Sequence, residues 1–354
     1  MITAHTDVVG SLLRPGALRK ARDDWMAGRL SHAQFKSIED RAVDEAVSLQ
    51  EAAGLDVVTD GEMRRLSFQS QMTEAVDGFG PWDWDINAFL WGHWHGDGAV
   101  GERRRDRPVN LGVVSRLVRK RHLAAEEFVY LRGRTSRVAK VTLPSPSLFV
   151  NFWSPERSQS AYASLEHFLA DVVAILRDEV AELVRLGATY IQIDAPHYPL
   201  LLAPETRTFY ESRGWTLDQW LSRGIELDNA VMGGFADVTF AIHLCRGNQE
   251  SRWLVEGDYE PNCPADFQAH RCNTASPRIR RRSVRLVCPA PARPRRQDGG
   301  PRIDQHQAAA NGGARRPHSS HYGSKPLCAA GTLGAQPPVR LCLFDRWKRA
   351  FHRG

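Results

Sequence analysis

A histidine and a cysteine two residues apart, His243 and Cys245, are the strongest candidates for chemistry in this sequence. Zinc in proteins prefers nitrogen and sulfur ligands of this kind. If both residues belong to one strand, their side chains point to the same face and can meet one ion. The alternative is a buried cysteine beside a histidine that touches solvent, because cysteine is among the most buried residue types. Two ligands do not complete a tetrahedral site, so both interpretations stay open.

Two acidic residues, Glu62 and Asp194, directly follow short apolar runs. A carboxylate at the end of a buried strand can hold a substrate ammonium group or share a proton. The ordinary alternative is a helix cap or a turn residue. Arg64 and Arg65 could grip an anion, or could form a solvated pair. Ser11 opens a loop whose hydroxyl and backbone amides could bind a small carboxylate, with a plain turn as the alternative.

The elements that must position these residues repeat one pattern: a helix, a glycine, a strand and then a polar residue. Apolar residues at steps of three and four predict helices over 31–53, 161–186 and 217–232. Short apolar runs predict strands over 55–59, 140–144, 189–193 and 237–242. Repeated units of this kind indicate an α/β protein with a parallel sheet.

A parallel sheet can be open and doubly wound, or closed into a barrel. Polar motifs at three strand ends favour a (β/α)8 TIM barrel, because active sites of that fold gather at the carboxyl-terminal rim. No glycine-rich phosphate-binding motif follows the strands, which argues against a nucleotide enzyme. We therefore expect Glu62, Asp194, His243 and Cys245 to converge at the rim.

The chain has 354 residues, of which 42% are hydrophobic and 25% charged, so it can bury a substantial core. No apolar run approaches the roughly 18 to 20 residues that a membrane-spanning helix needs. The first residues also lack a basic region followed by an apolar stretch. These features predict a cytoplasmic protein without a membrane partner.

The formal charge of +6 averages two dissimilar parts of the chain. Residues 1–261 contain 29 Lys and Arg against 37 Asp and Glu, a net charge of −8. Residues 262–354 contain 18 against 4, a net charge of +14, with 16 arginines, no glutamate and five of the six cysteines. We therefore divide the chain into a folded part, 1–261, and an Arg- and Pro-rich part, 262–354, that we expect to be disordered.

Two functions could be assigned to the basic part itself. Its arginines would attract nucleic-acid phosphates, and its cysteines could form links in a stabilised extension. However, aromatic residues are sparse there and the cysteines lack zinc-finger spacing. A cytosolic setting also argues against disulfides. We therefore expect no nucleic-acid partner.

Four motifs of residues 1–261 resemble the cobalamin-independent methionine synthase family. The resemblance is to short members, which correspond to the catalytic C-terminal barrel of the full-length enzyme. The motifs are VGSLLRP at 9–15, GLDVVTDGE at 54–62, IQIDAP at 191–196 and HLCRGN at 243–248. Each motif alone is weak, but the four in this order are specific.

The resemblance implies a (β/α)8 barrel with one zinc ion. It also implies methyl transfer from a methyl-folate of the 5-methyltetrahydropteroyltriglutamate type to the thiol of homocysteine, which forms methionine. By resemblance, His243 and Cys245 are two zinc ligands. Ser11 and Glu62 hold the amino-acid part of homocysteine, and Asp194 contacts it. Zinc would convert the thiol into a nucleophilic thiolate near neutral pH. No residue is assigned as the acid that protonates the folate amine.

The sequence departs from the family pattern in three places. Ala195 stands where full-length members have an acidic residue, so the native methyl donor and thiol acceptor stay open. The family also has a zinc-binding glutamate on a later strand and a zinc-binding cysteine in an SPQCGF setting. Neither motif occurs in this chain. The printed sequence therefore supplies two of the four expected zinc ligands.

Residues 262–354 have the composition of GC-rich coding DNA read in the wrong frame. One permitted back-translation from Pro264, reread one nucleotide later, begins QRIFKRIDATRLLLEYDDARSG and later contains SPQCGF. The missing glutamate then arises over Arg278 and the missing cysteine over Val339. We therefore predict a frameshift between Glu260 and Pro264, an incomplete barrel and an impaired enzyme. The alternatives are zinc-dependent alkyl transfer to another thiol, or a non-catalytic remnant.

Overall fold

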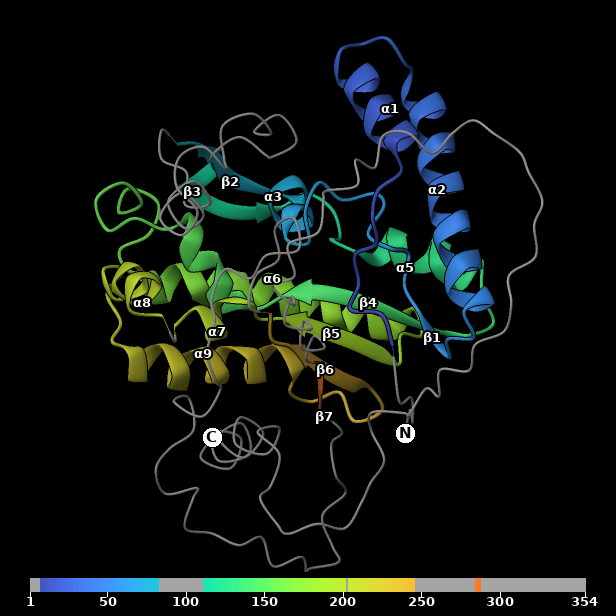
Figure 1. Ribbon diagram of the computed structural model, residues 1–354. Coiled ribbons are helices and arrows are strands. Elements are labelled where there is room, and N and C mark those ends of the chain that lie inside the picture. The colour runs from blue at the N-terminus through green and yellow to red at the C-terminus, as the bar shows by residue number, and fades with distance from the viewer. Residues whose placement is uncertain (1–6, 83–110, 202, 246–283, 288–354) are drawn as a thin grey trace, which may run out of the picture. The chain divides into compact units, whose positions relative to one another are not determined.

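The computed structural model describes residues 7–82, 111–201, 203–245 and the backbone of 284–287 (Figure 1). The helices are α1 Gly16–Met26, α2 His32–Ala52, α3 Ser70–Ala75, α5 Ala125–Arg132, the 3-10 helix η3 Pro146–Phe152, α6 Leu165–Arg185, α7 His197–Leu200, α8 Pro204–Glu211 and α9 Leu217–Met232. The strands are β1 Val57–Val58, β2 Val76–Pro81, β3 Leu111–Arg119, β4 Val138–Pro144, β5 Tyr190–Asp194, β6 Thr239–His243 and β7 Val284–Val287.

Five strands form one parallel sheet in the order β1, β4, β5, β6 and β7, which is also their order along the chain (Figure 1). A doubly wound sheet would reverse its strand order at a switch point, whereas a barrel adds each strand beside the previous one. The order therefore selects the barrel type. Within the described residues the sheet is open rather than closed, so the prediction of an incomplete α/β barrel is confirmed.

The three predicted helices are α2, α6 and α9, and each begins at a side-chain cap. Ser31 and Thr216 form capping boxes at the starts of α2 and α9, and Ser164 caps α6. Such caps satisfy backbone N–H groups that lack partners within the helix. Gly187 ends α6 with φ +95°, a conformation that glycine adopts without steric cost.

The outward face of the sheet carries the main core. Its side chains pack with the apolar faces of α6 and α9, and these two helices also contact each other. The outward residues are Val141, Leu143, Ile191, Ile193, Phe240 and Ile242. Because side chains alternate along a strand, this packing leaves the intervening residues on the inward face. The inward face is where the candidate site residues lie.

A separate antiparallel pair, β2 and β3, follows α3. The sequence did not predict it, because the glycines of β2 interrupt its apolar alternation and the pairing has an irregularity between Asp77 and Phe79. Its neighbouring segment, 83–110, lies outside the described residues.

The strand β7 lies in the part of the chain that we expected to be disordered. Its backbone pairs in parallel with β6, from Phe240 opposite Val284 to His243 opposite Val287. Without β7, β6 would be an edge strand with backbone groups open to pairing, and the two valines of the run Val-Arg-Leu-Val favour a strand. The expected boundary at residue 261 stays a prediction, because the rest of 262–354 lies outside the described residues. In the part that the structure describes, no helix has both the length and the apolar character to cross a bilayer.

Candidate active site

The inward face of the sheet is polar toward the carboxyl ends of its strands. Parallel register places Thr142 of β4 opposite Gln192 of β5, and Asp194 of β5 opposite His243 of β6. These residues are buried, although each carries a polar side chain. Buried polar groups need hydrogen-bond partners, so this face is a polar site within an otherwise apolar sheet.

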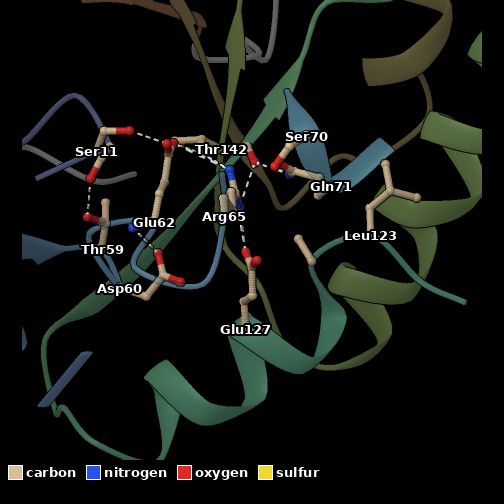
Figure 2. A network of polar contacts seen from close by, with 12 residues as sticks. Ser11, Thr59, Asp60, Glu62, Arg65, Ser70, Gln71, Leu123, Glu127 and Thr142 are labelled. Carbon is tan, nitrogen blue, oxygen red and sulfur yellow. Dashed lines mark hydrogen bonds and ion pairs between the residues drawn. The ribbon is translucent and has the colours of Figure 1, made fainter. Parts of the chain in front are cut away.

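Glu62 is the centre of this site and lies in the loop after β1 (Figure 2). It is 2% exposed, and among the described non-glycine residues it alone has a positive φ, 53°. Its Oε1 accepts a hydrogen bond from Thr142 Oγ1 at 2.7 Å, and its Oε2 accepts one from the Ser11 hydroxyl. Left-handed backbone in a non-glycine residue costs free energy and is concentrated at functional sites. The hydrogen bond between the two side chains brings the predicted pair, Ser11 and Glu62, together.

Arg65 lies beside Glu62 and is also 2% exposed (Figure 2). Its Nη1 is 3.3 Å from Glu62 Oε1, and its Nε and Nη2 donate to Glu127 Oε2 at 2.9 and 2.6 Å. Arg64 is also mostly buried and pairs with Asp40 at 2.5 Å. The solvated alternative is wrong for this pair, because both side chains are largely buried; Arg65 binds protein carboxylates, and binding of a separate anion stays a prediction. Sequence spacing could not reveal the partner Glu127, which is 62 residues away.

Asp194 is 4% exposed at the end of β5. Its Oδ1 accepts a hydrogen bond from Gln192 Nε2 at 2.7 Å. Burial, together with the nearby negative charge of Glu62, raises the pKa of Asp194 to about 8. Glu62 and Asp194 are therefore electrostatic neighbours, and a cation placed between them would relieve their repulsion.

His243 is the last residue of β6 and is 7% exposed, whereas Cys245 lies beyond the strand and is half-buried. The alternation rule used for the sequence therefore does not fix the direction of Cys245. His243 and Asp194 share one level of the sheet, because they are register partners. Thus three of the four residues expected at the rim lie on the same side of the sheet, and Cys245 follows two positions later.

The residues expected to bind zinc are His243 and Cys245. His243 and Cys245 are chemically suited to zinc, which is normally four-coordinate in proteins. Within the described ranges, no group of three or more His, Cys, Asp or Glu side chains is arranged to hold a metal ion. The described residues therefore do not fit a complete zinc site.

A second buried polar cluster links the loop after β4 to α7 and α9, and no sequence motif indicated it. Asp228 accepts hydrogen bonds from Ser145 Oγ at 2.6 Å and from Tyr198 OH at 2.7 Å. Ser147 Oγ lies 2.8 Å from His197 Nε2. Burial lowers the pKa of His197 to about 3 and raises that of Asp228 to about 7. The cluster fixes the segment that follows Asp194, because His197 begins α7 three residues later.

Comparison with known proteins identifies relatives of the first part of the chain. Residues 2–255 match the family model described as "Cobalamin-independent synthase, Catalytic domain". The Bacillus subtilis protein YxjH is 28% identical over 260 residues, which are 72% of this chain and 65% of YxjH. A 5-methyltetrahydropteroyltriglutamate–homocysteine methyltransferase of Syntrophotalea carbinolica is 27% identical over 259 residues, 72% of this chain and 31% of that protein. The chain thus spans less than two-thirds of these relatives.

A solved structure from Listeria monocytogenes, described as "Putative Vitamin-B12 Independent Methionine Synthase", shares the fold. Its TM-score is 0.50 at 22% identity, and the match covers 68% of this chain and 65% of that one. The family model matches well over half of the chain, in the region that contains every candidate site residue. The chain therefore belongs to the cobalamin-independent methionine synthase family, in its catalytic domain.

Proposed function

We propose that this chain derives from a methyltransferase that moves a methyl group from a methyl-folate to the thiol of homocysteine, forming methionine. The observation that carries the proposal is the buried Glu62, held in a left-handed backbone conformation beside Ser11 and Asp194. Two neighbouring carboxylates in a desolvated site suit the ammonium group of an amino acid. Family membership supplies the reaction, since relatives carry the name 5-methyltetrahydropteroyltriglutamate–homocysteine methyltransferase.

The described residues would act on the amino-acid end of the substrate. Glu62 and Asp194 would hold the ammonium group, and Ser11 would orient Glu62 through its hydrogen bond. In the reaction a sulfur–carbon bond forms and the nitrogen–carbon bond of the methyl-folate breaks. The folate nitrogen must gain a proton and the thiol must lose one. We assign neither proton transfer to a residue.

We propose that His243 and Cys245 are two ligands of a zinc site whose other ligands are absent from the described residues. The glutamate and cysteine that arise over Arg278 and Val339 in the shifted reading frame would complete it. His243 and Cys245 alone would hold a tetrahedral ion only weakly, because such a site needs four donors.

We further propose that the printed chain is impaired. A sheet that remains open has an unpaired edge and an incompletely covered core, which favour aggregation. Two alternatives from other classes remain testable: zinc-dependent alkyl transfer to a different thiol, and a remnant without catalysis. They differ in outcome, because the first requires turnover with some thiol and the second requires none.

The proposal is tested by expressing the printed chain beside a chain whose frame is restored by one nucleotide near codon 262. Each is supplied with zinc, a polyglutamylated methyl-folate and homocysteine, and methionine is measured by mass spectrometry. We expect methionine from the restored chain and little from the printed one. In the restored chain, Glu62→Gln should reduce turnover strongly, whereas the surface change Glu126→Gln should not. If the restored chain binds zinc and methylates other thiols but leaves homocysteine unchanged, zinc-dependent alkyl transfer to a different thiol is favoured. If it shows no turnover with any thiol, the proposed activity is wrong.

A further inference from the structure

Glu62 is held by a chain of charged groups that reaches outward to helix α5 (Figure 2). Arg65 is the middle member of this chain. Two of its nitrogens, Nε and Nη2, bind the same oxygen of Glu127 on α5 at 2.9 and 2.6 Å. Its remaining nitrogen, Nη1, is 3.3 Å from Glu62 Oε1. The guanidinium is thus shared unequally, and the shorter contacts go to Glu127.

Thr142 connects Arg65 and Glu62 a second time. Its hydroxyl accepts a hydrogen bond from Arg65 Nη1 at 2.7 Å and donates one to Glu62 Oε1 at 2.7 Å. The other carboxylate oxygen, Oε2, accepts from Ser11. An ionised carboxylate has about four acceptor positions, so the contacts from Thr142, Ser11 and Arg65 leave room for one more donor. The orientation of Glu62 is therefore fixed without exhausting its capacity to bind.

Charge balance around Arg65 favours an incoming cation. The carboxyl groups of Asp60, Glu62 and Glu127 all act electrostatically on this one guanidinium. Burial works to lower the pKa of Arg65, but the carboxylates of Glu127 and Glu62 outweigh it and raise the pKa above its usual range. With Glu127 taking the shorter contacts, the charge of Glu62 is only partly neutralised.

We propose that Glu127 is a positioning residue that engages Arg65 and thereby keeps the charge of Glu62 available for the ammonium group of an amino-acid substrate. This inference rests on the proposed function, because it names what the same site must bind. Without the Glu127 charge, Arg65 would turn its full charge on Glu62 and compete with the ammonium group. A purely structural role for Glu127, joining α5 to the loop after β1, would instead affect every ligand of the site equally.

The test compares two ligands that differ in the ammonium group alone: methionine and its des-amino analogue, 4-(methylthio)butanoate. Calorimetry measures binding of each to the printed chain and to Glu127→Gln, which keeps the size of the side chain and removes its charge. Glu126→Gln is the matched control, because Glu126 is the preceding residue of α5 and its side chain is 75% exposed. We expect Glu127→Gln to weaken methionine binding about tenfold, the effect of about one pKa unit of electrostatic interaction, and to change analogue binding less than about twofold.

A second variant guards against loss of folding in the first. Thr142→Val has nearly the same shape and removes the hydroxyl between Arg65 and Glu62. It should also weaken methionine more than the analogue, by about threefold, a fraction of the value of a hydrogen bond to a charged group. Equal weakening of both ligands in both variants would overturn the positioning role of Glu127 and leave the proposed function intact. Failure of the unmodified chain to bind methionine or homocysteine, in both its printed and its frame-restored form, would overturn the amino-acid site, and with it this inference.

Discussion

Glu179 on α6 holds the start of the helix that carries Glu127. Its side chain is fully buried, and its two oxygens accept hydrogen bonds from the backbone N–H groups of Leu123 at 2.8 Å and Ala124 at 2.7 Å. The N-cap residue of α5, Ala124, has no side-chain oxygen to do this itself. Glu179 therefore caps α5 from another helix, where a negative charge also interacts favourably with the helix dipole.

Glu179→Gln should lower the free energy of unfolding by about 2 to 3 kcal/mol. The amide replaces one acceptor oxygen with a donor, so one buried N–H loses its partner, and a hydrogen bond to a charged group is worth about 1.5 to 3 kcal/mol. Urea unfolding measures the global change, and hydrogen exchange over 123–128 measures the local one. Asp178→Asn, at the preceding, exposed position of the same helix, is the control and should leave both unchanged. If exchange over 123–128 is as slow in Glu179→Gln as in the unmodified chain, the capping argument is wrong.

Two further substitutions probe the site and its supporting cluster. Gly10→Ala would place a Cβ 2.9 Å from Glu62 Oε1 and 2.8 Å from Thr142 Cγ2. We therefore expect calorimetry to show loss of methionine binding, and the free energy of unfolding to fall by about 1 to 3 kcal/mol. Gly16→Ala is the control, because a Cβ at Gly16 would meet open space, and it should change neither binding nor stability. Burial raises the folded-state pKa of Asp228 to about 7, so the stability that it contributes is present below its unfolded pKa of about 4 and is lost as pH rises through 7. The free energy of unfolding, measured with urea, should therefore fall from pH 5 to pH 8 by about 2 kcal/mol more in the unmodified chain than in Asp228→Asn. An equal pH dependence in the two proteins would contradict the role of Asp228.

Long, regular elements were predictable from the sequence. The predicted helix 217–232 is α9. The four predicted strands correspond to β1, β4, β5 and β6, and each predicted end lies within two residues of the observed one. Their apolar faces repeat often enough to give a period, and caps such as Thr216 mark where they begin. Short elements such as α7 and η3 were missed, because one or two turns are too few to show a period.

The sequence indicated those site residues that lie in or beside a recognisable strand or loop motif. Glu62 and Asp194 were recognisable in this way, and the structure brings them near each other. The burial of Arg65 could not be predicted, because its partners Glu127 and Thr142 are 62 and 77 residues away along the chain. Such partners are set by packing between elements rather than by local sequence.

The central claim is that this chain contains the amino-acid half of a methyltransferase site and lacks half of its metal ligands. The most direct test is the number of zinc ions bound per chain, measured by metal analysis and chelator competition, in the printed chain and in the frame-restored chain. We predict one tightly bound zinc in the restored chain, its loss on changing His243 or Cys245 to alanine, and no tightly bound zinc in the printed chain. One zinc held as tightly by the printed chain as by the restored one would contradict it.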